Sequence, residues 1–167
     1  MTDLLSTKPE PSNWKREIGL LLINNKIISY SVGEKYSVTF DFFCAWNNRD
    51  KGCYLTMIHS HPMAIDGPSS IDINMMDGWS KAFDIPILYI IVTQDVVNFY
   101  LFTLVEKKAC HFLLGSSPLN SFFDKIMFAS QCEDHEVGSA TEEFKLNMDC
   151  EIEIFFNIKE LDIWGPL

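Results

Sequence analysis

The N-terminal part of the chain alternates between short apolar runs and polar breaks, a pattern typical of β-strands joined by turns. Residues 18–23 and 27–30 are mostly apolar, and the Asn-Asn-Lys sequence at 24–26 predicts a hairpin turn between them. The β-branched and aromatic residues at 36–43 predict a third strand, with a short helix after it as the alternative. The polar segment 47–52 then predicts a loop.

The next apolar run, 54–61, predicts a strand that stops at Pro62, because proline has no N–H to donate to a sheet. From position 70 the apolar residues recur at helical spacing, which predicts a helix with one apolar face. The residues of that face are Ile71, Met75, Trp79, Ala82 and Phe83. Pro86 ends this helix.

Three further strands are expected after the helix. The continuous apolar run 87–92 indicates a strand buried in the centre of a sheet, and 96–104 and 109–114 predict two more. The order of these elements predicts an α/β fold with a central, mostly antiparallel sheet flanked by helices.

The C-terminal part begins with a second amphipathic pattern, which predicts a helix. Its apolar positions are Leu119, Phe122, Phe123, Ile126 and Met127. Segment 131–144 is acidic and rich in turn-forming residues and predicts a loop, whereas the alternation at 150–156 predicts a strand with one exposed face. We expect one domain, with a flexible lead-in at 1–13, a main body at 14–115 and a helix-and-strand extension at 116–167 packed on the same body.

Composition narrows the class of protein and its partners. The chain has 167 residues, of which 47% are hydrophobic and 13% aromatic, as expected for a packed globular protein rather than a disordered one. The formal net charge of −10 disfavours nucleic acid or an anionic membrane as a partner, since either would repel the surface. The charge is compatible with a basic protein partner but does not establish one.

The cysteines favour a reducing compartment. Five cysteines, an odd number, are widely spaced and form no C-x-x-C pair, which is a poor disulfide framework and a poor zinc-finger pattern. The N-terminus shows no basic-then-apolar signal segment, and no apolar run approaches the ~20 residues of a membrane span. We therefore expect a soluble, cytoplasmic protein.

Two histidines and an aspartate form the strongest chemical signal. His59 and His61 are two positions apart at the end of a predicted strand, so their side chains project from the same face. A short Gly/Pro/Ser loop at 66–70 can bring Asp72 back to them. Two imidazoles and a carboxylate predict a zinc site, and three protein ligands leave a fourth position for water, as in catalytic zinc sites.

The sequence H-S-H-P at 59–62, followed by S-x-x-D at 69–72, resembles the JAMM motif of the MPN-plus, or JAB-type, zinc metallopeptidases. The resemblance covers roughly residues 15–110 and implies a single MPN-like catalytic domain at 14–115. Members of this family hydrolyse isopeptide or peptide bonds, often at the C-terminus of ubiquitin or a ubiquitin-like protein. In the family, the residues that match His59, His61 and Asp72 bind Zn²⁺.

Asp72 and Ser69 have a structural alternative to these roles. Serine followed three positions later by an acid, ahead of a helix, is also a capping box, in which each side chain bonds a backbone N–H. The capping and metal-binding roles of Asp72 are partly compatible, because a carboxylate held there could offer its outward oxygen to zinc. Ser69 is either the cap or, as the family implies, the hydroxyl that stabilises the oxyanion; Ser70 could instead provide the cap.

The family also implies a glutamate from an earlier strand as general base. Glu17 is the preferred candidate because it opens an apolar strand and is followed closely by Gly19, although many members place one more residue between the two. Glu10 and Glu34 are weaker candidates, the first in a proline-flanked lead-in and the second in a turn. An ordinary solvated glutamate is the alternative for Glu17.

The resemblance thus implies a zinc-dependent peptidase or isopeptidase whose substrate is a ubiquitin-like or other protein with an extended C-terminal tail. Such a tail could bind by strand addition along an open sheet edge. A non-catalytic MPN module that serves as a scaffold or assembly interface is an alternative, as is a phage or prokaryotic JAB peptidase acting on an assembly protein. A further protein partner in a complex is compatible with each of these.

Overall fold

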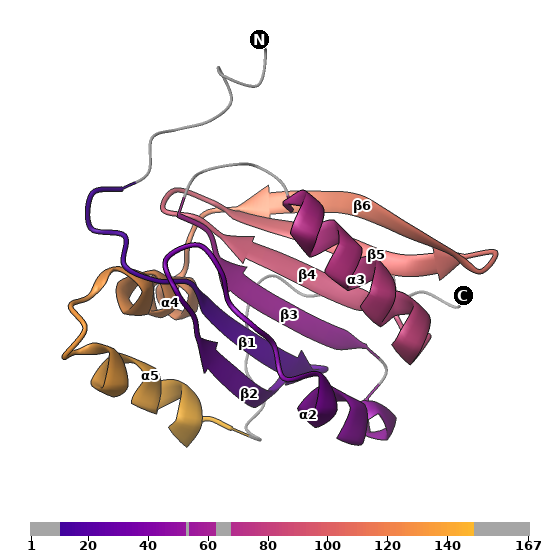
Figure 1. The fold of residues 1–167 in the computed structure, drawn as a ribbon, viewed down its shortest axis with the longest axis horizontal. Coiled ribbons are helices and arrows are strands. Elements are labelled where there is room, and N and C mark those ends of the chain that lie inside the picture. The colour runs from indigo at the N-terminus through magenta and orange to yellow at the C-terminus, as the bar shows by residue number, and fades with distance from the viewer. Residues whose placement is uncertain (1–10, 53, 63–67, 149–167) are drawn as a thin grey trace, which may run out of the picture.

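The computed structural model describes residues 11–52, 54–62 and 68–148, and a six-stranded sheet runs through the centre of this part of the chain (Figure 1). The strands are β1 (Ile18–Ile23), β2 (Lys26–Val32), β3 (Leu55–Ser60), β4 (Ile87–Val92), β5 (Val97–Val105) and β6 (Lys108–Ser117). They lie in the order β2-β1-β3-β4-β5-β6, and only β3 and β4 pair in parallel. The predicted α/β class and mostly antiparallel sheet are confirmed.

Helices cover both faces of the sheet. Helices α2 (Phe42–Asn47) and α3 (Ser70–Phe83) contribute to a core on one face, and α4 (Ser121–Gln131) and α5 (Val137–Leu146) to a core on the other (Figure 1). The parallel β3–β4 pair requires a crossover, which α3 provides. None of the described helices is long and apolar enough to cross a bilayer.

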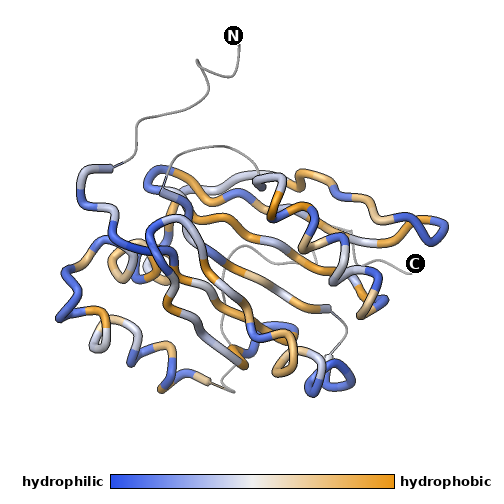
Figure 2. The backbone as a smooth tube through the Cα atoms, in the orientation of Figure 1, coloured by the Kyte–Doolittle hydropathy of each residue, from blue (hydrophilic) through white to orange (hydrophobic). Residues whose placement is uncertain are grey.

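The alternation of side chains along the strands decides which residues enter which core. On β1, Leu20 and Leu22 face α4, whereas Leu21 and Ile23 face α3. Strands β1, β3 and β4 are buried along their whole length, which explains the nearly continuous apolar sequence of β1 and β4. Strand β3 also carries buried polar side chains, at Thr56, His59 and Ser60. Figure 2 shows this concentration of hydrophobic positions in the central strands.

The third predicted strand is wrong. Residues 36–41 form no strand beyond an isolated bridge between Glu34 and Ser37, and the aromatic pair that follows belongs to α2. Asp41 caps this helix by accepting a hydrogen bond from the Cys44 N–H at 3.0 Å. Phe42 then packs against α3, with its ring centroid 5.1 Å from that of Trp79. Aromatic packing on a helix has thus overridden the strand preference of these residues.

The acidic segment predicted as a loop also contains a helix. Helix α5 occupies much of 131–144 because Thr141 and Phe144, three residues apart, are both buried against the core. Phe144 packs against Phe122 of α4, with ring centroids 6.2 Å apart. Segment 47–52, predicted as a loop, contains one turn of 3₁₀-helix at Arg49–Lys51. The strand predicted at 150–156 and most of the lead-in predicted at 1–13 lie outside the described residues.

Helix α3 buries part of its predicted apolar face, since Trp79 and Phe83 are buried and Met75 packs against the core. Ile71 is 77% exposed and Ala82 is also exposed, whereas Asp72 and Met76 are buried together with the predicted Trp79 and Phe83. The inward face therefore begins with a carboxylate, and this orientation of the helix brings Asp72 to the sheet.

Candidate metal centre

The pairing of β1 with β3 places three predicted site residues on one face of the sheet. In the antiparallel register Gly19 lies opposite His59, and continuing that register by two positions places Glu17 opposite His61. Residues two apart on a strand share a face, so all three side chains project toward the α3 side. The side chains of His59 and His61 thus point to the same face of the sheet, as their spacing in the sequence predicts.

The three side chains meet at the end of β3. Ligand atoms of Glu17, His59 and His61 all lie within 4.8 Å of one another, and the residues are buried, with 5%, 3% and 9% exposure. The imidazole rings of His59 and His61 have centroids 4.5 Å apart. These three buried residues could hold a metal ion.

Asp72 completes the cluster from the first turn of α3. Its Oδ2 atom lies 3.3 Å from Nε2 of His61 and 3.8 Å from Nε2 of His59. Ligand atoms bound at 2.0–2.1 Å to a tetrahedral ion are about 3.3 Å apart, so the Asp72–His61 spacing already matches and the Asp72–His59 spacing is slightly long. The structure thus brings Glu17, His59, His61 and Asp72 together from three elements that are distant in sequence.

Burial sets the protonation states in this cluster. Burial raises the pKa of Glu17 to about 8, and the charge of Asp72 adds to the rise. Burial also lowers the pKa of His59 to about 3, with a further lowering by His61 and an opposing effect of Asp72. Without a cation, therefore, Glu17 holds a proton at neutral pH and His59 is neutral.

Asp72 keeps its charge in this buried position. Burial by itself would raise its pKa, but a hydrogen bond with His61, the electrostatic interaction with His59 and the backbone hydrogen bond from Ser69 together hold the pKa below its ordinary value. A neutral imidazole with a free lone pair and a charged carboxylate are the forms that bind metal.

The donor set fits a divalent cation. Nε2 of His59 and Nε2 of His61 both face Oδ2 of Asp72, so two imidazole nitrogens and a carboxylate oxygen converge in a buried position. Imidazole nitrogens combined with carboxylate oxygens suit zinc and similar first-row ions rather than calcium, which takes six to eight oxygen ligands.

Ser69 is the N-cap of α3, so the capping role considered for Ser69 is present in the structure. Its Oγ accepts a hydrogen bond from the Asp72 N–H at 3.1 Å, and the Ser69 N–H donates to Oδ2 of Asp72 at 2.9 Å, so the capping box is complete. Ser70, proposed as an alternative cap, lies inside the helix. The Asp72 oxygen that bonds the cap is the same one that faces the histidines, rather than a separate outward oxygen. Ser69 is exposed and its hydroxyl proton remains available for donation.

The residue between the two histidines ties the site to α4. Ser60 points to the opposite face, where its Oγ accepts from the Ile18 N–H at 2.9 Å and lies 2.7 Å from Oγ of Ser130. Ser130 in turn donates to the Ile126 carbonyl at 3.0 Å, so the proton between the two hydroxyls comes from Ser60. This buried chain fixes the start of β1 relative to the end of β3.

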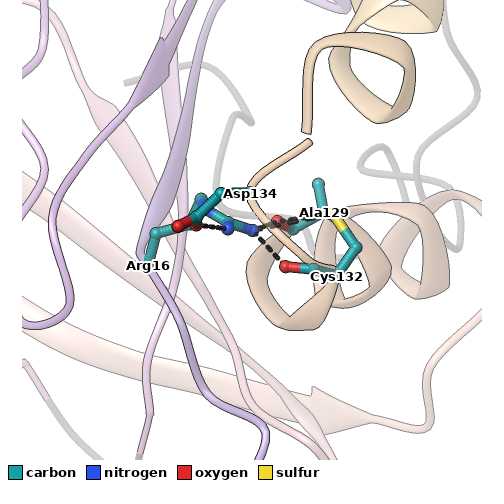
Figure 3. A network of polar contacts seen from close by, with 4 residues as sticks. All are labelled: Arg16, Ala129, Cys132 and Asp134. Atoms are coloured by element: carbon teal, nitrogen blue, oxygen red, sulfur yellow. Dashed lines mark hydrogen bonds and ion pairs between the residues drawn. The ribbon is translucent and has the colours of Figure 1, made fainter. Parts of the chain in front are cut away.

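Arg16, next to Glu17, makes a second connection to α4 (Figure 3). Its Nη1 atom donates to the carbonyls of Ala129 and Cys132 at 2.6 and 2.9 Å, and its Nη2 pairs with Asp134 at 2.6 Å. Arg16 is only 5% exposed, so these bonds satisfy a buried guanidinium and the open C-terminal carbonyls of the helix together. The exposed Asp134 side chain contributes less than the two carbonyls.

Residues 38–40 cover the site from the side of β2. A Cβ atom on Gly19 would lie 2.9 Å from the Phe40 ring, so the absence of a side chain there lets Phe40 approach. The Phe40 ring centroid is 6.1 Å from that of His59. The connection between β2 and α2 also fixes the backbone of Glu17, because the Glu17 N–H donates a hydrogen bond to the Glu34 carbonyl at 2.8 Å. Glu34, a weaker candidate for the base, is exposed, and Glu10 lies outside the described residues.

One residue of the cluster was missed by sequence reasoning. Tyr89 of β4 is fully buried, and its hydroxyl lies 2.9 Å from Nε2 of His59. The available signal was a hydroxyl-bearing side chain inside an otherwise purely aliphatic run, because a buried tyrosine usually finds a hydrogen-bond partner.

Comparisons with known proteins add no relative to this geometry. A scan of protein-family models, a search of curated proteins and a search of solved structures each find no match to the chain. The candidate metal centre is therefore inferred from the geometry and chemistry of this chain's own residues.

Proposed function

We propose that the protein is a zinc-dependent metallopeptidase or isopeptidase similar to the JAMM enzymes. The observation that carries the proposal is the meeting of His59, His61 and Asp72 with Glu17 at the end of β3. The chain order of these residues, with H-S-H-P before S-x-x-D, is the order that the resemblance implies. A scaffold module has no need of four buried ionisable groups in one cluster, since each costs desolvation energy.

Zinc is the ion we assign to this centre. His59, His61 and Asp72 would be its protein ligands, which leaves a position for water. Bound there, zinc would lower the pKa of that water to about 7 and polarise the scissile carbonyl.

Glu17 has the position and environment of a general base. Its ligand oxygen lies within 4.8 Å of both histidine nitrogens, close enough to reach a water at the centre. A cation held beside it would favour the ionised form of Glu17, which can then take a proton from water. Burial favours the protonated form, so the carboxyl can keep that proton until it passes it to the leaving amine. In this proposal Glu17 serves first as base and then as acid.

Ser69 supplies a donor on the open side of the centre. Its oxygen is engaged in the cap, but its hydroxyl proton can point toward the oxyanion of the reacting amide. Removing one such donor typically lowers the rate by ~10²–10³.

The substrate class that the resemblance suggests is an amide at the extended C-terminal tail of ubiquitin or a ubiquitin-like protein. An extended tail can bind by strand addition, and the described sheet has two edge strands, β2 and β6. A cytoplasmic location and a further protein partner are parts of this proposal.

Metal analysis of the purified protein tests the centre. We expect about one zinc per chain in the native protein and none in His59→Ala/His61→Ala. His135→Ala is the matched control, because His135 is 78% exposed and outside the cluster, and this variant should retain the metal. A native protein that binds no divalent ion would contradict the proposal and favour the scaffold alternative.

Cleavage assays test the chemistry separately. Glu17→Gln should keep the metal and lose cleavage of a panel of fusions that carry ubiquitin-like C-terminal tails. Cleavage by the metal-loaded Glu17→Gln protein at the native rate would move the base to another residue. A native protein that holds zinc but cleaves no member of the panel would exclude this substrate class.

A further inference from the structure

Tyr89 lies beside the proposed metal ligands, yet neither the JAMM-like motif nor the proposed reaction assigns it a role. Strands β3 and β4 pair in parallel with Met57 opposite Tyr89 and His59 opposite Ile91. Tyr89 therefore projects from the same face as His59 but starts two residues lower on the sheet, and its long side chain reaches the imidazole. The ring is held by Phe102 of β5, with centroids 5.7 Å apart and the rings nearly perpendicular.

The Tyr89 hydroxyl and a metal ion compete for the same nitrogen. The hydroxyl oxygen is 2.9 Å from Nε2 of His59, the atom that also faces Asp72. A ring nitrogen has one lone pair, so Nε2 cannot accept a hydrogen bond and bind a cation simultaneously. When an ion takes Nε2, the hydroxyl must find another acceptor, because it is fully buried and a lost hydrogen bond there is costly.

Asp72 offers a charged acceptor beside the same atom, because its Oδ2 lies 3.8 Å from the Nε2 that the Tyr89 hydroxyl contacts at 2.9 Å. A phenol hydroxyl is protonated at neutral pH and can donate to a carboxylate. Outer hydrogen bonds of this kind orient a metal-binding carboxylate.

We propose that Tyr89 is a positioning residue of the metal centre, whose hydroxyl bonds Nε2 of His59 before an ion binds and donates to the Asp72 carboxylate once the ion has taken that nitrogen. The inference rests on the proposed function, because it assumes that His59 and Asp72 are ligands. It assigns Tyr89 to the protein's hold on the ion and not to the reacting atoms.

Metal-binding titrations of three proteins test this role. The proteins are the native chain, Tyr89→Phe and the control Tyr100→Phe, which removes a hydroxyl from the tyrosine that pairs with Tyr89 across the β4–β5 ladder. In competition with a chelating dye, Tyr89→Phe should bind Zn²⁺ about 10–100-fold more weakly than the native protein, the usual effect of losing such an outer hydrogen bond. Tyr100→Phe should bind as the native protein does.

The Co²⁺ form supplies a spectroscopic signature that a merely structural role would not change. The visible ligand-field bands should shift or change intensity in Tyr89→Phe, because Asp72 loses the hydrogen bond that orients it, and should be native in Tyr100→Phe. Native Zn²⁺ affinity with native bands in Tyr89→Phe would overturn the inference, and tighter Zn²⁺ binding would show that the hydroxyl only competes with the ion. A phenolate-to-metal charge-transfer band in the Cu²⁺ form of the native protein would make Tyr89 a direct ligand and overturn the inference as well.

One further measurement covers a variant that does not fold, and two outcomes separate failure of the proposed function from failure of the role of Tyr89. If Tyr89→Phe does not fold, the near-ultraviolet difference spectrum of the native protein replaces it: Zn²⁺ should perturb tyrosine absorption in the native protein and in Tyr100→Phe alike, and an unperturbed spectrum would overturn the inference. If the native protein binds neither Zn²⁺ nor Co²⁺, the proposed function fails. If the native protein binds and Tyr89→Phe is identical to it, only the role of Tyr89 fails.

Discussion

Replacing Glu17 with glutamine should change how the stability of the metal-free protein depends on pH. Glutamine keeps the size and shape of the side chain but cannot ionise. In the native protein, burial raises the pKa of Glu17 from 4.5 to about 8. Between these values the unfolded chain has lost the proton while the folded chain keeps it, so the folded state binds more protons and native stability falls as pH rises.

The magnitude follows from the width of the pH window. Below pH 6.5 the depressed pKa of His59 gives an opposite slope, because the unfolded state binds the extra proton there. Above pH 6.5 the effect of His59 fades within about one pH unit, and Asp72, whose lowered pKa acts only in acid, does not contribute. From pH 6.5 to about 8, at up to ~1.4 kcal/mol per pH unit, Glu17 should lower the free energy of unfolding by about 1–2 kcal/mol.

Urea unfolding of chelator-treated native protein and Glu17→Gln, measured at several pH values, checks this. Groups common to both proteins cancel in the difference, which should move by about 1–2 kcal/mol in favour of Glu17→Gln between pH 6.5 and 8. Parallel stability curves would refute the raised pKa and with it the proton-holding role of Glu17. Saturating Zn²⁺ should stabilise the native protein, because only the folded state assembles the site.

Three other substitutions probe the supports of the site. Arg16→Met should lower the free energy of unfolding by about 2–4 kcal/mol in urea titrations, because it leaves buried carbonyls unpaired. Asp134→Ala, which removes only the exposed ion pair, should cost under about 1 kcal/mol. Equal effects of the two substitutions would contradict the view that the carbonyl bonds matter more than the ion pair. Ser60→Ala should cost about 1–3 kcal/mol and weaken Zn²⁺ binding, and native Zn²⁺ affinity would show that the hydroxyl chain does not position the histidines. Asp72→Asn should keep the helical circular dichroism signal, because Ser69 remains the N-cap and the asparagine amide oxygen can still accept from the Ser69 N–H, but it should lose most Zn²⁺ affinity. Retained Zn²⁺ affinity would leave Asp72 a member of the capping box only.

Local patterns predicted the strands and the site better than the helices on the flanks. His59, His61 and Asp72 could be anticipated because the two histidines share a strand face and Asp72 follows after a short loop, whereas Glu17 was suggested only by the resemblance. Helix α5 could not, because burial of Phe144 depends on Phe122 and not on a regular apolar period in its own segment. The wrong strand at 36–43 has the same origin, since packing of its aromatic residues on α3 decided their conformation.

The inward face of α3 and the position of Tyr89 required tertiary information. Hydrophobicity alone placed Ile71 inside, but Ile71 is exposed and its neighbour Asp72 is buried against two imidazoles. Tyr89 reaches His59 only because β3 and β4 are parallel neighbours in a particular register. A sequence predicts neither the neighbour of a strand nor its register when both faces are buried and apolar.

The bonds that Ser130, Ala129 and Cys132 make to β1 and β3 bear on how the chain can be shortened. A fragment ending at residue 115 would contain every proposed ligand and the proposed base, yet it would lack the helix that fixes the strand ends bearing them. The minimal unit worth expressing for crystallography or assay thus extends through α4 to at least Asp134. Conversely, a small molecule wedged between α4 and the sheet would disturb the centre from the opposite side, without entering it.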